Sequence, residues 1–137
     1  MGKQILIVED HPLNLELARD LLEAHGYTVA AAGDAKECLA RIGEQRPDLI
    51  LMDVQLPGKD GLQITAELRA NPATQSLRIV AMTAHAMAAD AQRARAAGCD
   101  GYLTKPIQTR TFVDQISAFL DGTSTWLGAP HPEKAQP

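Results

Sequence analysis

The amino-acid sequence predicts an α/β fold: a doubly wound parallel sheet of five strands in (βα)₅ order, with helices on both faces. Three observations favour this class. Five short apolar runs recur along the chain, each is followed by a segment with helical spacing, and the first and third runs are apolar at nearly every position. Strict alternation requires crossover connections, which make the strands parallel and place helices on both faces. Of the doubly wound arrangements, we expect the flavodoxin-like strand order 2-1-3-4-5.

The five apolar runs are the predicted strands. Ile5-Leu6-Ile7-Val8 and Leu49-Ile50-Leu51-Met52 have the continuous apolar character of strands that are buried on both faces. We expect the strands at residues 4–8, 27–31, 48–52, 78–82 and 101–103.

The first two helical segments carry start and stop signals. Pro12 suits an opening turn and Gly26 a helix end, and Asp34 is a suitable N-cap for the second helix, which would run to Gly43. On the first helix we expect one buried apolar stripe, formed by Leu13, Leu17, Ala18, Leu21 and Leu22. On the second, the expected apolar residues are Ala35, Cys38, Leu39 and Ile42.

The remaining helices differ in how firmly they should pack. The third begins near Gly61 and ends near Asn71, because Pro72 cannot continue its hydrogen-bond ladder. The fourth, about residues 88–97, is rich in alanine with few large apolar side chains, so we expect loose packing. The fifth, residues 110–120, has a strongly apolar face formed by Phe112, Val113, Ile116, Phe119 and Leu120.

Length and composition indicate one ordinary globular domain. The chain has 137 residues, of which 45% are hydrophobic and 22% charged. We expect the folded domain at residues 1–121 and a flexible tail at 122–137, where several glycines and prolines occur without apolar periodicity and only Trp126 could dock.

Charge, apolar runs and cysteine content also limit the partners and the cellular location that we expect. The net charge of −4, without a basic cluster, argues against a nucleic-acid partner. The start of the chain lacks a signal peptide, and no apolar run approaches the roughly 20 residues that a membrane span needs. Cys38 and Cys99 lack metal-site spacing and suit buried thiols in a reducing compartment. We therefore expect a cytoplasmic protein without a membrane partner.

Polar side chains of one chemical set follow four of the predicted strands. Glu9 and Asp10 follow the first strand, Asp53 the third and Thr83 the fourth, and Lys105 lies just past the fifth. Ligands of open parallel sheets bind beyond the carboxyl ends of the strands, so these residues should converge on one edge.

The chemistry of such a set is narrow. Glu9, Asp10 and Asp53 offer hard oxygen ligands suited to Mg²⁺, and Asp53 can act as a nucleophile toward a phosphoryl group. The Lys105 ammonium and the Thr83 hydroxyl could surround the phosphoryl oxygens. Taken singly, each residue has an ordinary explanation as a helix cap, a turn residue or a surface lysine. No turn or cap requirement explains all of them together.

These residues resemble the signature of response-regulator receiver domains over about residues 3–121. The resemblance is carried by Glu9-Asp10, the segment from Leu51 to Gly58 around Asp53, Thr83-Ala84, and Tyr102-Leu103-Thr104-Lys105-Pro106. The stretches 8–14 and 20–27 further resemble single-domain cell-cycle receivers of the DivK type and receivers fused to hybrid histidine kinases.

The resemblance implies a role for each matching residue. Asp53 would be the phosphoacceptor, Glu9 and Asp10 the acids of the Mg²⁺ site, and Gln55 a metal ligand through its backbone carbonyl. Lys105 would bind a phosphoryl oxygen, and the bond before Pro106 would be cis. Thr83 and Tyr102 would form a switch pair, in which the Tyr102 ring turns inward; the alternative for Tyr102 is a fixed, partly exposed aromatic.

The resemblance also implies a signalling mechanism. Phosphorylation of Asp53 would shift the populations of two conformations of the face that is built from the fourth helix, the fifth strand and the fifth helix. The expected partners are a histidine kinase or histidine phosphotransfer protein and a downstream protein target. We expect a phosphoacceptor switch with at most self-phosphorylation and self-dephosphorylation activity, and a monomer that dimerises, if at all, on phosphorylation.

His85 is the least typical position near the expected site. It follows Thr83 by two residues, near the family's path for the water that hydrolyses the acyl phosphate. One hypothesis is that its charge state tunes the phosphoryl lifetime between about pH 6 and 8. The alternative is an exposed loop histidine without effect.

Other functions stay open on the sequence alone. A haloacid-dehalogenase-like phosphatase usually needs a second acid two residues after its aspartate, where this chain has Gln55. A flavodoxin-like module needs a loop rich in Ser, Thr and Gly after the first strand, where Glu9-Asp10 would repel a flavin phosphate. The third alternative is a phosphorylation-independent interaction domain of the same shape. We expect an independent protein, with a segment of a hybrid kinase as the alternative.

Overall fold

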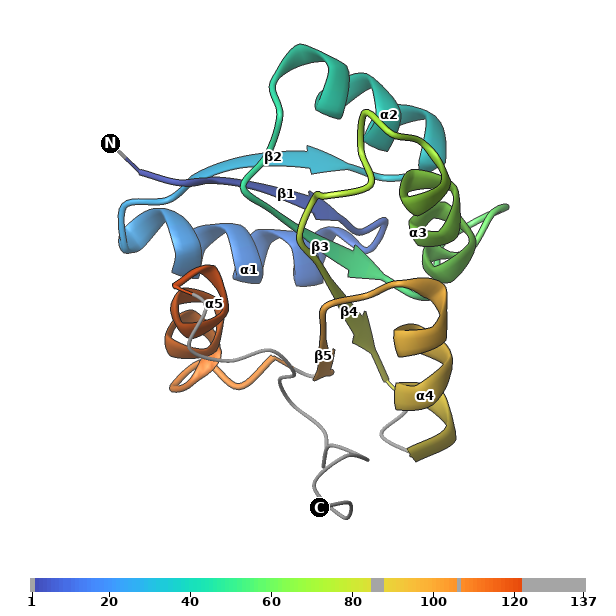
Figure 1. Cartoon of the computed structure of the whole chain (residues 1–137). Helices are drawn as coiled ribbons and strands as arrows, with labels where there is room; N and C mark the ends of the chain where they lie inside the picture. The colour runs from blue at the N-terminus through green and yellow to red at the C-terminus, as the bar shows by residue number, and fades with distance from the viewer. Residues whose placement is uncertain (1, 85–87, 106, 122–137) are drawn as a thin grey trace.

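The computed structural model describes residues 2–84, 88–105 and 107–121, and in these residues strands and helices alternate as the sequence predicts (Figure 1). The strands are β1 (Gln4–Val8), β2 (Thr28–Ala32), β3 (Leu49–Asp53), β4 (Ile79–Thr83) and β5 (Gly101–Thr104). The helices are α1 (Pro12–Ala24), α2 (Ala35–Glu44), α3 (Gly61–Ala70), α4 (Ala88–Ala97) and α5 (Phe112–Leu120).

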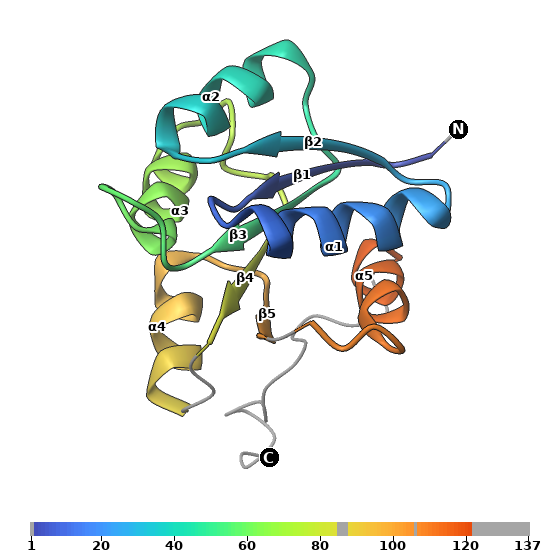
Figure 2. The ribbon, with the colours of Figure 1, turned by 180° about the vertical axis from the view of Figure 1, so that it is seen from behind.

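The sheet has the predicted topology. Its strand order is β2-β1-β3-β4-β5, and every neighbouring pair is parallel. Helices α1 and α5 cover one face and α2, α3 and α4 cover the other (Figures 1 and 2). The carboxyl ends of β1, β3 and β4 lie in register, with Val8 opposite Met52 and Asp53 opposite Met82. Residues that follow these strands therefore meet at one edge.

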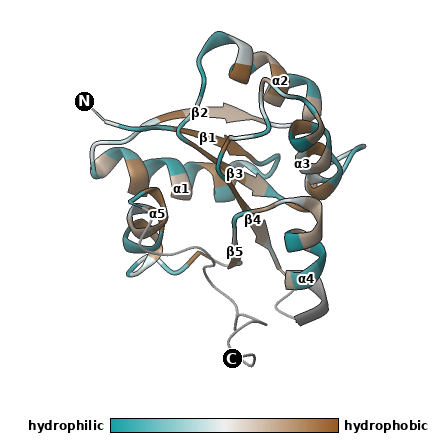
Figure 3. Ribbon diagram, viewed as in Figure 1, coloured by the Kyte–Doolittle hydropathy of each residue, from teal (hydrophilic) through white to brown (hydrophobic). Residues whose placement is uncertain are grey.

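The core has two layers because the sheet is buried on both faces. Ile5 and Ile7 belong to the layer under α1 and α5, whereas Leu6 and Val8 belong to the layer under α2, α3 and α4. Figure 3 shows the apolar character that runs through the central strands. Alternate side chains of a strand point to opposite faces, so a run that is apolar at every position fills both layers.

Three strands begin and end one residue later than predicted. The observed strands β2, β3 and β4 end at Ala32, Asp53 and Thr83. Asp53 and Thr83 are polar, which suggested positions beyond the strands, but neighbouring parallel strands continue the ladder through them. Val54 N donates to Met82 O at 2.9 Å and Lys105 N to Thr83 O at 2.7 Å.

Side-chain caps fix where the helices near the site begin. The Asp34 carboxylate accepts a hydrogen bond from Glu37 N at 2.8 Å, which confirms its predicted role as N-cap of α2. Asp60 and Gln63 form a capping box at the start of α3, with distances of 2.9 and 3.0 Å. Gly26 has a φ of +90° just past α1, as its predicted stop role requires.

The predicted apolar faces of α1 and α2 are partly wrong. Ala18 and Leu22 are buried, but Leu13 is 71% exposed and Leu17 is also exposed. Successive helical residues are separated by about 100° around the axis, which turns Leu13 well away from the Ala18 and Leu22 stripe. On α2, Leu39 is 53% exposed because it lies one residue past the buried Cys38.

The remaining sequence predictions on packing have mixed outcomes. The described buried residues of α4 are Ala91 and Ala94, so this helix contributes small side chains to the core, as its composition indicates. The tail at 122–137, with Trp126, lies outside the described residues, and the boundary at 121 stays a prediction. Among the described helices, none combines the length and the apolar character that crossing a bilayer requires.

Candidate functional site

Three carboxylates gather at the carboxyl edge of the sheet. One oxygen from each of Glu9, Asp10 and Asp53 lies within 4.8 Å of the others. Glu9 and Asp53 are each 2% exposed, and Asp10 is exposed to solvent. Glu9 and Asp10 follow β1, and Asp53 is the last residue of the neighbouring strand β3. The cluster therefore follows from the pairing of the two central strands.

Lys105 provides a cation for the two buried acids. Its Nζ lies 2.9 Å from Glu9 Oε1 and 3.0 Å from Asp53 Oδ2, and 16% of its side chain is exposed. Its backbone is fixed because Lys105 N donates to Thr83 O on β4. One ammonium thus bridges the ends of β1 and β3.

Backbone N–H groups orient the carboxylates further. His11 N donates to Glu9 Oε2 at 3.1 Å, and Gln55 N donates to Asp53 Oδ1 at 3.0 Å. With the contact to Lys105, both oxygens of Asp53 have a partner, whereas the buried Glu9 Oε1 lies at ion-pair distance from Lys105 Nζ but has no hydrogen-bond donor among the described residues. The Gln55 side chain itself is exposed.

The electrostatics of the site reflect crowding of like charges. Burial raises the pKa of Glu9, the hydrogen bond with Asp53 and its charge raise it further, and the contact with Lys105 opposes these effects. Burial by itself lowers the pKa of Lys105, but the hydrogen bonds and charges of Glu9 and Asp53 outweigh it, so that the pKa is raised overall. Lys105 is therefore a permanent cation at neutral pH.

Thr83 and Tyr102 lie beside the acid cluster. Thr83 ends β4 and is buried, and the Tyr102 ring is fully buried, so the alternative of a partly exposed aromatic is wrong. Both line a hollow of about 270 Å³ together with Val54, Gln55, Asp60, Leu62 and Arg93. The hollow is next to the end of β3, where Asp53 lies.

Two predicted residues cannot be placed. Pro106, with its expected cis bond, and His85 both lie outside the described residues. The backbone carbonyl of Gln55 as a metal ligand also stays a prediction. The residues that the structure does bring together are Glu9, Asp10, Asp53 and Lys105, with Thr83 at the end of the adjacent strand.

Sequence analysis missed Gly61, which abuts the backbone of Asp53. A Cβ atom at Gly61 would overlap Asp53 O and would lie 2.9 Å from both Asp53 C and Met52 Cγ. Gly61 N also donates to Val54 O at 3.0 Å. A glycine as the first residue of a helix, where glycine has no conformational advantage, is the signal that indicates such a close approach.

The donor set fits a hard divalent cation. Three carboxylates with converging oxygens are the ligands that Mg²⁺ prefers, and the exposed Asp10 leaves one side of the cluster accessible to water and phosphate oxygens. Lys105 offsets only one of the three negative charges, so a cation would also relieve repulsion.

The fold and the site together define a class: doubly wound α/β proteins with an acidic, lysine-paired cluster at the carboxyl edge of the sheet. Comparison with known protein families identifies the family within this class. The sequence model of the family described as "Response regulator receiver domain" matches residues 5–117, and the chain therefore belongs to the response-regulator receiver family.

Individual relatives agree with this assignment. The "Polar-differentiation response regulator DivK" of Brucella anthropi is 42% identical over 120 residues, which cover 88% of this chain and 98% of the relative. Among solved structures, a LuxR-family two-component response regulator from Aurantimonas sp. has a TM-score of 0.83 at 36% identity, covering 99% of this chain and 94% of that one.

A second solved structure bears on the metal. The receiver domain of a sensor histidine kinase from Pseudomonas aeruginosa has a TM-score of 0.78 at 34% identity and covers 89% of this chain and 99% of that one. It is described with a magnesium ion coordinated in its active-site cleft.

Proposed function

We propose that this receiver domain is a phosphoacceptor switch of a two-component pathway or phosphorelay, in which Asp53 accepts a phosphoryl group from a histidine kinase or phosphotransfer protein. The observation that carries the proposal is the convergence of Glu9, Asp10 and Lys105 on Asp53. The chain would act on itself at most, by self-phosphorylation and self-dephosphorylation.

The transfer would proceed in one displacement. A carboxylate oxygen of Asp53 attacks the phosphorus, the P–N bond to the donor imidazole breaks, and the electron pair and a proton go to the imidazole nitrogen. Lys105 Nζ, 3.0 Å from Asp53 Oδ2, would pair with a transferred oxygen. Mg²⁺, when held by Glu9, Asp10 and Asp53 and by the backbone carbonyl of Gln55, would supply the charge that offsets the phosphoryl oxygens.

The output would leave through the face of α4, β5 and α5. Thr83 ends β4 directly before the segment that leads into α4, so a hydrogen bond from Thr83 to the phosphoryl group would pull on this segment. Tyr102, buried under α4 on β5, would hold the inward state. The result is a population shift between two arrangements of this face.

The phosphodonor protein would contact α1. Helix α1 begins at Pro12, two residues past Asp10, and its exposed Leu13 is therefore near the site that a donor histidine must reach. An apolar contact at this rim would orient the donor without covering Asp53. We propose the cytoplasm as the location, because Cys38 and Cys99 are free buried thiols that suit a reducing compartment.

The proposal is tested by phosphorylation of the full chain. Mg²⁺ with a small-molecule phosphodonor should increase the mass by one phosphoryl group, and Asp53→Asn should abolish the increase. Asp34→Asn is the matched control, because Asp34 caps α2 and asparagine caps helices equally well. Labelling that persists in Asp53→Asn would overturn the assignment, and continuous turnover of a phosphate ester would instead favour a phosphatase.

A further inference from the structure

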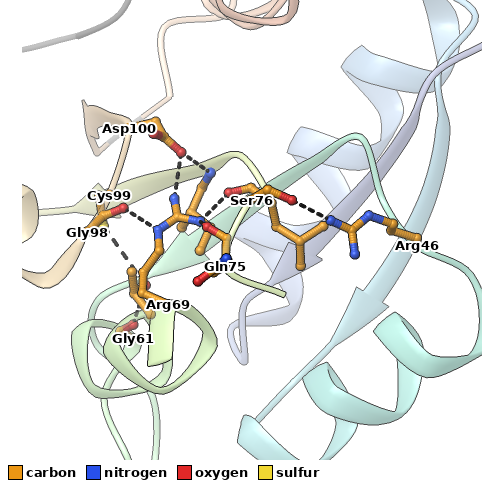
Figure 4. Close-up of polar contacts among 11 residues, drawn as sticks. Arg46, Gly61, Arg69, Gln75, Ser76, Gly98, Cys99 and Asp100 are labelled. Atoms are coloured by element: carbon orange, nitrogen blue, oxygen red, sulfur yellow. Dashed lines mark hydrogen bonds and ion pairs between the residues drawn. The ribbon is translucent and has the colours of Figure 1, made fainter. Parts of the chain in front are cut away.

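Arg69 lies in the last turn of α3, at the amino ends of β4 and β5 and so at the opposite end of the sheet from Asp53. It joins α3 to the segments at residues 75–77 and 98–100. Its Nε donates to Gly98 O at 2.8 Å, and its Nη2 forms an ion pair with Asp100 Oδ2 at 2.7 Å (Figure 4). Its Nη1 donates to Gln75 O at 2.8 Å and also to Leu77 O. The planar guanidinium is suited to this, because it presents several donors in a fixed geometry.

The segment held by Arg69 is the C-terminal end of α4. Gly98 follows the last residue of α4, has a φ of +107°, and closes the helix through Gly98 N to Arg95 O at 3.0 Å. A Cβ atom at Gly98 would lie 2.6 Å from Arg69 Cγ, so the two residues are in close contact. The positive charge of Arg69 is also favourable beside the carbonyl end of a helix.

Asp100 extends the connection from α3 into the sheet. Its Oδ2 accepts from Ile79 N at 3.0 Å in addition to Arg69, and Asp100 N donates to Ile79 O at 2.7 Å. The α4–β5 connection is therefore fixed both to α3 and to the start of β4. The contact surface of α4 itself is weak, since its described buried side chains are the methyl groups of Ala91 and Ala94.

Helix α3 is itself fixed at its other end. Gly61 N donates to Val54 O, just past β3, at 3.0 Å, and in the middle of the helix Cys99 Sγ lies 3.9 Å from Thr65 Oγ1. Gly61 abuts the backbone of Asp53, as described above. Helix α3 thus spans from the end of β3 to the end of α4 and has polar contacts at both ends, through Gly61 N and through Arg69.

We propose that Arg69 is a positioning residue that fixes the C-terminal end of α4 to α3, so that a rearrangement started at Thr83 tilts α4 about Gly98 and does not displace the whole helix. The inference rests on the proposed function for its starting signal. Arg69 touches neither Asp53 nor its cation site; it sets which part of the output face moves.

The test is hydrogen exchange of the full chain, free and with Mg²⁺ and beryllium fluoride as a phosphoryl mimic. In the wild type, the response to the mimic should include the first half of α4 and leave residues 95–100 unchanged. In Arg69→Met, the response should extend to residues 95–100. In the free protein, exchange at 95–100 should already be about tenfold faster in Arg69→Met, as expected for loss of a charged hydrogen bond.

Arg46→Met is the matched control. Arg46 makes its described hydrogen bonds to the α3–β4 connection, with Ala73 O at 2.7 Å and Ser76 Oγ at 2.9 Å. This variant loosens the same edge, yet should leave exchange at 95–100 and the extent of the response as in the wild type. Asp100→Asn removes the ion pair and keeps an acceptor, so it tests the inference with a milder change if Arg69→Met unfolds.

Two results would overturn the inference. One is a response confined to the first half of α4 in both Arg69→Met and Asp100→Asn, with unchanged exchange in the free proteins. The other is equal spreading in Arg46→Met, which would indicate general loosening. If the wild type does not respond to the mimic, the proposed function fails, whereas exchange in the free proteins still decides whether Arg69 fixes the end of α4.

Discussion

The contact between Gly61 and Asp53 makes a sharp prediction for Gly61→Ala. The added Cβ would overlap Asp53 O and lie 2.9 Å from Asp53 C and Met52 Cγ, where ordinary contact needs 3.4–4 Å. To restore contact with the oxygen, the start of α3 and the end of β3 must separate by about 1 Å. The hydrogen bond from Gly61 N to Val54 O ties the start of α3 to the chain just past β3, so the end of β3 has to absorb part of this shift.

The shift should affect both stability and reactivity. Overpacking of this kind lowers the free energy of unfolding by about 1–3 kcal/mol. A displacement of about 1 Å of a reacting group can lower a rate by about 100-fold. We therefore expect Gly61→Ala to be folded at 25 °C but to be phosphorylated about 100-fold more slowly than the wild type.

Gly43→Ala is the matched control, because a Cβ at Gly43, also in a helix, meets no atom within 4 Å. This variant should gain about 0.5–1 kcal/mol from the better helix propensity of alanine and keep the wild-type rate. Urea unfolding measures stability, and mass spectrometry over time with Mg²⁺ and a small phosphodonor measures the rate. A Gly61→Ala protein that reacts at the wild-type rate would refute the role of this contact.

Three further predictions follow from the structure. Lys105→Met should lower the free energy of unfolding of the metal-free protein by about 2 kcal/mol, less than the roughly 3–5 kcal/mol lost when a fully buried ion pair is broken, and Mg²⁺ should restore part of this loss. Urea titration measures both effects, and equal stability of the variant and the wild type would contradict the ion-pair geometry. Burial raises the pKa of Cys38 and Cys99 from 9.0 to about 12, so the thiols of the unfolded chain lose their protons at lower pH than those of the folded protein. The free energy of unfolding should therefore fall between about pH 9 and 12, and it should fall less in the double variant Cys38→Ala, Cys99→Ala. Leu13→Ser should slow phosphotransfer from a cognate donor protein but not from a small phosphodonor, whereas Leu39→Ser, also at an exposed leucine, should change neither rate.

The parallel sheet could be predicted because its determinants are local. An apolar run at every position, as in Leu49-Ile50-Leu51-Met52, implies burial on both faces wherever the strand lies, and the structure buries all four residues. The exposure of Leu13 and Leu39 could not be predicted in this way. It depends on the angle at which α1 and α2 meet the sheet, which neighbouring elements determine.

The candidate site was predicted as a set of residues but not as an arrangement. Topology brings the ends of β1 and β3 together, so the proximity of Glu9, Asp10 and Asp53 follows from strand order. The unequal burial of Glu9 and Asp10 does not follow, because the chain has left the strand and its direction there depends on the turn into α1. The contact of Gly61 with Asp53 also requires three-dimensional packing.

Lys105 has a position that would couple the chemistry of the site to its output. With all groups ionised, three carboxylates and one ammonium leave a formal charge of −2, and Lys105 is shared between Glu9 and Asp53 at 2.9 and 3.0 Å. A phosphoryl group on Asp53 would bring about −1.5 to −2 charges within reach of the same ammonium. Lys105 would then have to give up at least one of its present partners. Lys105 N donates a hydrogen bond to Thr83 O, so a displacement of the lysine would act on the ends of β4 and β5. Strand β4 leads into α4, and β5 is part of the proposed output face. In the proposed mechanism, redistribution of the contacts of this partly buried lysine therefore accompanies the change at Thr83.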